Sequence, residues 1–138
     1  MGAWGAGTFD NDSAADFAGD FEEHDREGGL DAIREALDAV LEEEDYLDSD
    51  IAIDALVACE AIARLAGQGG EQSSYSATLD AWVAKFPGGV GKALAKRGLA
   101  VIERVMAPES ELPELWEGGA EWLAAMADLK RRVAAAAA

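Results

Sequence analysis

Apolar side chains that recur every three or four residues constrain this chain more than any other feature of its sequence. The clearest stripe has acidic and basic side chains on its opposite face, as in an amphipathic helix. Its members are Leu30, Ile33, Leu37, Val40 and Leu41. No segment shows the sustained alternation of apolar and polar residues that is typical of a half-buried strand. The pattern therefore predicts an all-α fold, a single compact domain of five or six helices packed around one core.

The same spacing, together with the residues that flank each stripe, predicts five further helices. They are expected over about residues 12–24, 49–66, 79–86, 90–106 and 110–133. Gly28 and Gly29 are expected to end the helix over residues 12–24, and Ser49 or Asp50 is expected to cap the helix over residues 49–66. That helix has few polar positions, so we expect it to be central and mostly buried. In the last helix, Arg132 is expected beside other bases near the negative end of the helix dipole.

The whole chain, residues 1–138, is predicted to be one helical domain with three less regular segments. Residues 1–11 form a glycine-rich N-terminal arm, 67–75 a flexible loop and 134–138 a frayed tail of alanines. The sequence shows no secretory signal and no run of the about 18 apolar residues that a membrane span requires. We therefore expect a cytoplasmic protein, with its single cysteine, Cys59, buried as a small apolar residue.

Charge is distributed unevenly along the chain. Residues 1–60 hold 19 acidic and two basic residues, whereas residues 61–138 hold nine of each, so the net charge of −17 belongs to the first part. Phosphate groups are bound by Lys and Arg, which the acidic part almost lacks. This composition excludes a nucleic-acid binder, and an anionic membrane surface is excluded for the same reason.

Recognisable catalytic motifs are absent from the sequence. Residues 86–93 superficially resemble a phosphate-binding loop but lack its first glycine and its Ser or Thr. The only histidine falls among carboxylates that share its predicted helix face and are weak candidates for ligating a divalent ion. These candidates are Asp16, Asp20, His24 and Glu27. A solvated acidic surface is the simpler interpretation, so we expect no catalytic residue, no cofactor and no specific metal site.

The most distinctive candidate for a binding surface is the acidic run that joins the second and third predicted helices. It places six acids around one tyrosine and one leucine. The candidate binding residues are Glu42, Glu43, Glu44, Asp45, Tyr46, Asp48 and Asp50. A solvated loop would explain the run equally simply. The functional interpretation is a docking point for a basic partner, with Tyr46 as its aromatic anchor.

The N-terminal sequence contains a motif of glycines, aromatic residues and a helix-capping pair. Its residues are Gly2, Trp4, Gly5, Gly7, Phe9, Asn11 and Asp12. This opening resembles a bacterial family known as domain of unknown function 4259, and residues 58–63, 79–82 and 110–116 are similar to that family too. The resemblance implies a small helical protein and brings no known activity. Physically, Trp4 and Phe9 are expected to fold onto the helices as a plug while Asn11 or Asp12 caps the first helix. A ligand site on Trp4 is the alternative.

Two main hypotheses for function follow from these observations. The first is a non-catalytic protein-interaction module of the immunity or regulatory type, whose acidic N-terminal half binds a basic protein. The alternative is a metal-dependent or small-molecule enzyme that uses the carboxylates near His24. A third, salt adaptation, would spread the acidic residues over both halves of the chain, which the neutral segment 61–138 does not do. The oligomeric state stays open.

Overall fold

Helices make up most of the computed structural model, which describes residues 8–9, 11–70, 72, 74, 76–86, 88 and 90–138. Within these residues there are seven α-helices, one 3-10 helix and no strand, which confirms the predicted all-α class. The elements are α1 (Asp12–Gly19), the 3-10 helix η1 (Asp20–Glu23), α2 (Arg26–Leu41), α3 (Ser49–Leu65), α4 (Ala77–Lys85), α5 (Lys92–Met106), α6 (Glu111–Leu115) and α7 (Ala120–Ala137). Across the described ranges, no helix is both long and apolar enough to cross a membrane.

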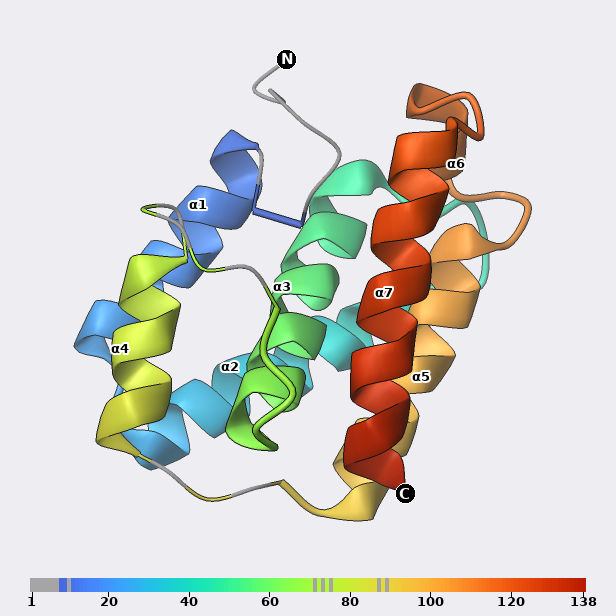
Figure 1. The fold of residues 1–138 in the computed structure, drawn as a ribbon. Helices are drawn as coiled ribbons and strands as arrows, with labels where there is room; N and C mark the ends of the chain where they lie inside the picture. The colour runs from blue at the N-terminus through green and yellow to red at the C-terminus, as the bar shows by residue number, and fades with distance from the viewer. Residues whose placement is uncertain are drawn as a thin grey trace.

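Helix α3 runs through the middle of the molecule, as its few polar positions predict (Figure 1). It contacts all six other α-helices. Helices α1 and α4 lie on one side of it and the α5–α7 pair on the other, while α2 crosses behind it in this view. Every residue from Ala55 to Leu65 is buried. The other helices therefore pack against α3, which is mostly apolar, as well as against one another.

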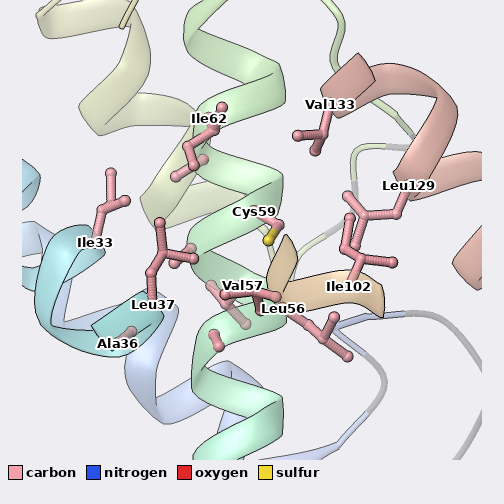
Figure 2. Close-up of a cluster of buried hydrophobic side chains, with 14 of the residues drawn as sticks. Ile33, Ala36, Leu37, Leu56, Val57, Cys59, Ile62, Ile102, Leu129 and Val133 are labelled. Carbon is pink, nitrogen blue, oxygen red and sulfur yellow. The ribbon is translucent and has the colours of Figure 1, made fainter. Parts of the chain in front are cut away.

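Aliphatic side chains from four helices pack together in the core (Figure 2). The largest contributions come from α2, α3, α5 and α7: Ile33, Leu37, Val57, Ile62, Ile102, Leu129 and Val133. Cys59 lies among them, fully buried, with its thiol 3.5 Å from the carbonyl oxygen of Gly98. Burial raises the pKa of this thiol far above its ordinary value, so it stays protonated. The prediction that Cys59 is buried is confirmed.

The first predicted helix, residues 12–24, is wrong in its second half. The α-helix ends at Gly19, and η1 follows as a tighter turn until His24 adopts an extended backbone. Asp25 then caps α2, its carboxylate accepting a hydrogen bond from the amide of Gly28 at 2.7 Å. The two glycines expected to end the first helix therefore lie in the first turn of α2. Gly29 is there because the ring of Trp82 covers it so closely that a Cβ would fall 2.1 Å from a ring carbon.

The last predicted helix, residues 110–133, is two helices. Helix α6 ends after five residues because Glu117 and Gly118 take left-handed backbone angles, with φ of 51° and 64°. The amide of Gly118 donates to the carbonyl oxygen of Pro113, and that of Glu117 to Glu114, which is the Schellman termination of a helix. The apolar spacing continues across this break, which explains why the pattern by itself missed it.

Smaller differences concern the ends of elements. Asp48, not Ser49 or Asp50, occupies the N-cap position of α3. Leu41, expected in the inward stripe of α2, is 39% exposed. Residues 134–138 were expected to fray, yet α7 continues to Ala137. Most of the predicted arm, 1–11, and part of the predicted loop, 67–75, lie outside the described residues.

Candidate functional site

The acidic run of residues 42–50, called here the acidic loop, connects α2 to α3 and is fixed to a distant part of the chain. The amide of Leu47 donates to the carbonyl oxygen of Glu109 at 2.9 Å, and the amide of Glu111 donates to that of Leu47 at 2.9 Å. These bonds form a short parallel bridge between Leu47 and Ser110. The side chain of Leu47 is fully buried beneath it. The loop is therefore anchored, and its one leucine points inward rather than to a partner.

Two more side chains from the C-terminal half hold the loop in place. Arg104 of α5 donates through Nη2 to the carbonyl oxygen of Asp45 at 2.6 Å and through Nη1 to that of Glu109 at 3.4 Å. The carboxylate of Glu111 accepts a hydrogen bond from the amide of Ser49 at 2.8 Å. That amide has no hydrogen-bond acceptor within α3, and the N-cap residue Asp48 does not supply one from its side chain. Glu111 therefore caps the helix from a distant part of the chain.

Tyr46 is presented at the surface of the acidic loop in a fixed orientation. Its side chain is 41% exposed in total, and its hydroxyl donates to Oε2 of Glu114 on α6 at 2.7 Å. This hydrogen bond, together with the surrounding carboxylates, raises the pKa of Tyr46 to about 12. The phenol therefore remains a neutral donor at physiological pH, and the ring is available to a binding partner.

The structure extends the acidic surface beyond the residues that the sequence singles out. Around the loop it gathers three acids from the neutral half of the chain, Glu109, Glu111 and Glu114. We call the acidic loop and these three residues the acidic face. Of the predicted loop residues, Glu43 is half-buried and the remaining acids are exposed, namely Glu42, Glu44, Asp45, Asp48 and Asp50. The sequence identified the centre of this surface but not its other side.

The four weak metal candidates do not share one helix face. Asp16 lies on α1, Asp20 on η1 and Glu27 in the first turn of α2, with the extended residue His24 between them. The ring of His24 packs edge-on against Phe21, with 5.1 Å between the ring centres. Among the residues that the structure describes, no three His, Cys, Asp or Glu side chains are placed to hold a metal ion.

The N-terminal motif is described only in its last part. Phe9 is buried, and the guanidinium of Arg64 lies 5.0 Å from the centre of its ring. Asn11 is the N-cap of α1, its side chain accepting a hydrogen bond from the amide of Ala14 at 2.8 Å, while Asp12 is the first residue of the helix. Both observations agree with the predicted plug and cap. The rest of the motif lies outside the described residues: Gly2, Trp4, Gly5 and Gly7.

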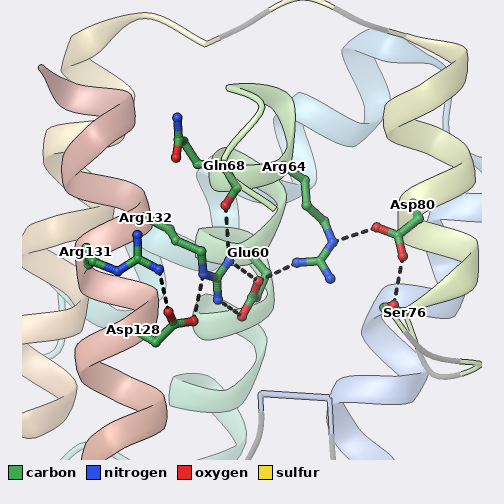
Figure 3. Close-up of polar contacts among 8 residues, drawn as sticks. All are labelled: Glu60, Arg64, Gln68, Ser76, Asp80, Asp128, Arg131 and Arg132. Carbon is green, nitrogen blue, oxygen red and sulfur yellow. Dashed lines mark hydrogen bonds and ion pairs between the residues drawn. The ribbon is translucent and has the colours of Figure 1, made fainter. Parts of the chain in front are cut away.

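A network of ion pairs, buried at its centre, connects α3 to α4 and α7 (Figure 3). At its centre, Arg132 donates from Nη1 and Nη2 to the two oxygens of Glu60 at 2.8 and 2.9 Å. Arg64 also bonds Glu60 and donates from Nε to Asp80 at 2.6 Å. Asp128 completes the network by accepting from Nε of Arg132 at 2.9 Å. Each carboxylate is matched by a guanidinium, so the network is suited to fixing helices rather than to chemistry.

No pattern in the sequence predicted this network. The sequence pattern places Arg132 beside other bases at the negative end of the last helix, whereas the structure buries this residue to 6% exposure. Burial alone would lower the pKa of this guanidinium, but the hydrogen bonds and charge of Glu60 outweigh that effect and raise it. The useful signal was Glu60 itself, a charged residue in the most apolar stretch of α3 that must find a partner once buried.

Comparison with known proteins assigns the chain to a family but indicates no activity. No curated protein and no solved structure matches it. The model of one family, described as a domain of unknown function (DUF4259), matches residues 2–127. That span includes the N-terminal motif, the acidic face and the network residues Glu60, Arg64 and Asp80. The chain belongs to the DUF4259 family.

Proposed function

We propose that this protein is a non-catalytic interaction module, of the immunity or regulatory type, whose acidic face binds a basic protein partner. The observation that carries the proposal is the fixed exposure of Tyr46 among carboxylates drawn from both halves of the chain. An exposed aromatic ring surrounded by charges of one sign is the composition expected of an anchor in a charged interface.

The support of the acidic loop favours this function over a purely solvated surface. Backbone hydrogen bonds from Leu47 and the two bonds donated by Arg104 hold the loop in one conformation. A preordered loop loses less conformational entropy when a partner binds. The net negative charge of the loop also attracts a basic partner over several ångströms, which speeds association and makes it sensitive to salt.

Affinity capture tests the proposal. The full chain is immobilised, exposed to native lysate of the source organism at about 0.05 M and about 0.5 M NaCl, and the retained proteins are identified by mass spectrometry. We expect a basic protein to be retained at low salt and largely lost at high salt. Capture that is insensitive to salt, or the absence of any specific partner, would contradict the proposal.

A further inference from the structure

A small groove lies at the junction of α1, α2 and α3, beside the acidic loop. It has a volume of about 260 Å³. Its walls are mostly apolar and include Phe17 of α1, Ala36 of α2 and Ile51 of α3. Two carboxylates, those of Glu35 and Asp54, also line it. The groove is therefore apolar along its sides and negatively charged at two points.

Asp54 differs from Glu60 and Asp80, the carboxylates of α3 and α4 that belong to the ion-pair network. Glu60 and Asp80 bond to arginines, whereas Asp54 makes no hydrogen bond and no ion pair with any residue that the structure describes. It is half-buried, and none of the basic residues of the chain lines the groove. Burial, followed by the charges of Asp50 and Asp20, raises its pKa to about 6. At neutral pH this is a mostly ionised carboxylate without a counter-ion.

We propose that this groove receives one lysine or arginine side chain of the basic partner, with its cationic group at Asp54 and its hydrocarbon stem along Phe17 and Ile51. Long basic side chains bury their stems on apolar surface and keep the charge at a polar end, which matches the distribution of apolar and charged groups here. The inference rests on the proposed function, since it gives the acidic face a specific pocket.

The position of the groove agrees with this role. Asp50 is the last residue of the acidic loop, and the next residue, Ile51, is part of the groove wall. A partner that contacts Asp50 at the end of the acidic loop is therefore next to the groove wall. The electrostatic attraction of the acidic loop is long-ranged and does not require one exact alignment of the partner. The hydrocarbon stem of a side chain in the apolar groove, in contrast, fixes the position of one residue of the partner.

An NMR titration of the full chain tests the inference, with octalysine amide as the probe. Wild type is compared with Asp54→Asn, which removes the charge and keeps the shape, and with Glu121→Gln, which removes one exposed charge from α7. In wild type we expect saturable shifts at the amides of Ile51 and Asp54 as well as in the acidic loop. In Asp54→Asn we expect the groove shifts to vanish and the affinity to fall about fivefold. Glu121→Gln should behave as wild type.

Each other result has a definite meaning. Equal binding by Asp54→Asn and Glu121→Gln, or shifts confined to the acidic loop, would overturn the groove inference while leaving the proposed function standing. No shift at either place would overturn both. An octaglutamine peptide of the same length serves as the neutral probe, and groove shifts with that peptide would also overturn the requirement for a cation.

Discussion

Arg132 of α7 holds Glu60 of α3 in a two-point contact, with Nη1–Oε1 and Nη2–Oε2 distances of 2.8 and 2.9 Å. The two residues are 72 positions apart, and both are at least nine-tenths buried. The contact therefore fixes the C-terminal helix to the central one at a single register. Charges buried in this way cost free energy to desolvate, which good geometry must offset.

Glu60→Gln should lower the free energy of unfolding by about 3 kcal/mol, because it leaves two buried guanidinium groups facing a neutral amide. Urea unfolding followed by circular dichroism measures the change. The matched control is Glu103→Gln, whose carboxylate lies 3.6 Å from the ammonium group of Lys130 on the surface. That substitution should change stability by less than about 0.5 kcal/mol. Similar effects of the two substitutions would contradict the structural role of the network.

Gly29→Ala should destabilise the fold by about 1–3 kcal/mol, because a Cβ there would lie 2.1 Å from a ring carbon of Trp82. The ring cannot move away freely, since its Nε1 donates to the carbonyl oxygen of Asp25 at 3.1 Å. Thermal unfolding and tryptophan fluorescence report the effect. Gly19→Ala, where a Cβ meets no atom within 4 Å, is the control and should be neutral or slightly stabilising. If both alanines are tolerated alike, the close packing of Trp82 on α2 is incorrect.

Glu117→Gly should stabilise the protein by about 0.5–1 kcal/mol, because Glu117 adopts a left-handed conformation, with φ of 51°, that glycine takes without strain. Glu117→Gln keeps the strain and removes the charge, so it should leave stability unchanged and separate the two causes. Chemical denaturation of the three proteins makes the comparison. A larger gain from Gln than from Gly would assign the effect to charge instead of backbone geometry.

Asp54→Asn should raise the free energy of unfolding by about 1 kcal/mol at pH 7.5, a figure reduced for the solvent that reaches this half-buried group. The folded-state pKa, about 6, lies above the ordinary value of 3.8, so the native state holds more protons between these values. The stability contributed by Asp54 is therefore complete below pH 3.8 and lost as pH rises through about 6. Unfolding curves for both proteins from pH 4 to 7.5 should diverge with rising pH. A difference in unfolding free energy between the two proteins that does not change with pH would contradict the raised pKa of Asp54.

Helices that are encoded by local spacing could be predicted, and contacts between distant segments could not. The stripe from Leu30 to Val40 defines α2, and the apolar run of α3 correctly indicates a central helix. The break near Gly118 was missed because the apolar stripe stays in phase across it. The acidic loop was identified from its composition, but its bond from Tyr46 to Glu114 joins residues 68 positions apart, which no local pattern encodes.

The affinity of purified proteins decides whether the acidic face binds a basic protein. Isothermal titration of the captured partner compares wild type with Glu44→Gln/Asp45→Asn in the acidic loop. The control, Glu103→Gln/Glu121→Gln, removes the same charge from α5 and α7. We expect the loop variant to bind about tenfold more weakly at low salt and the control to bind as wild type. Equal weakening by the two variants would show that only total charge matters and would contradict binding at the acidic face.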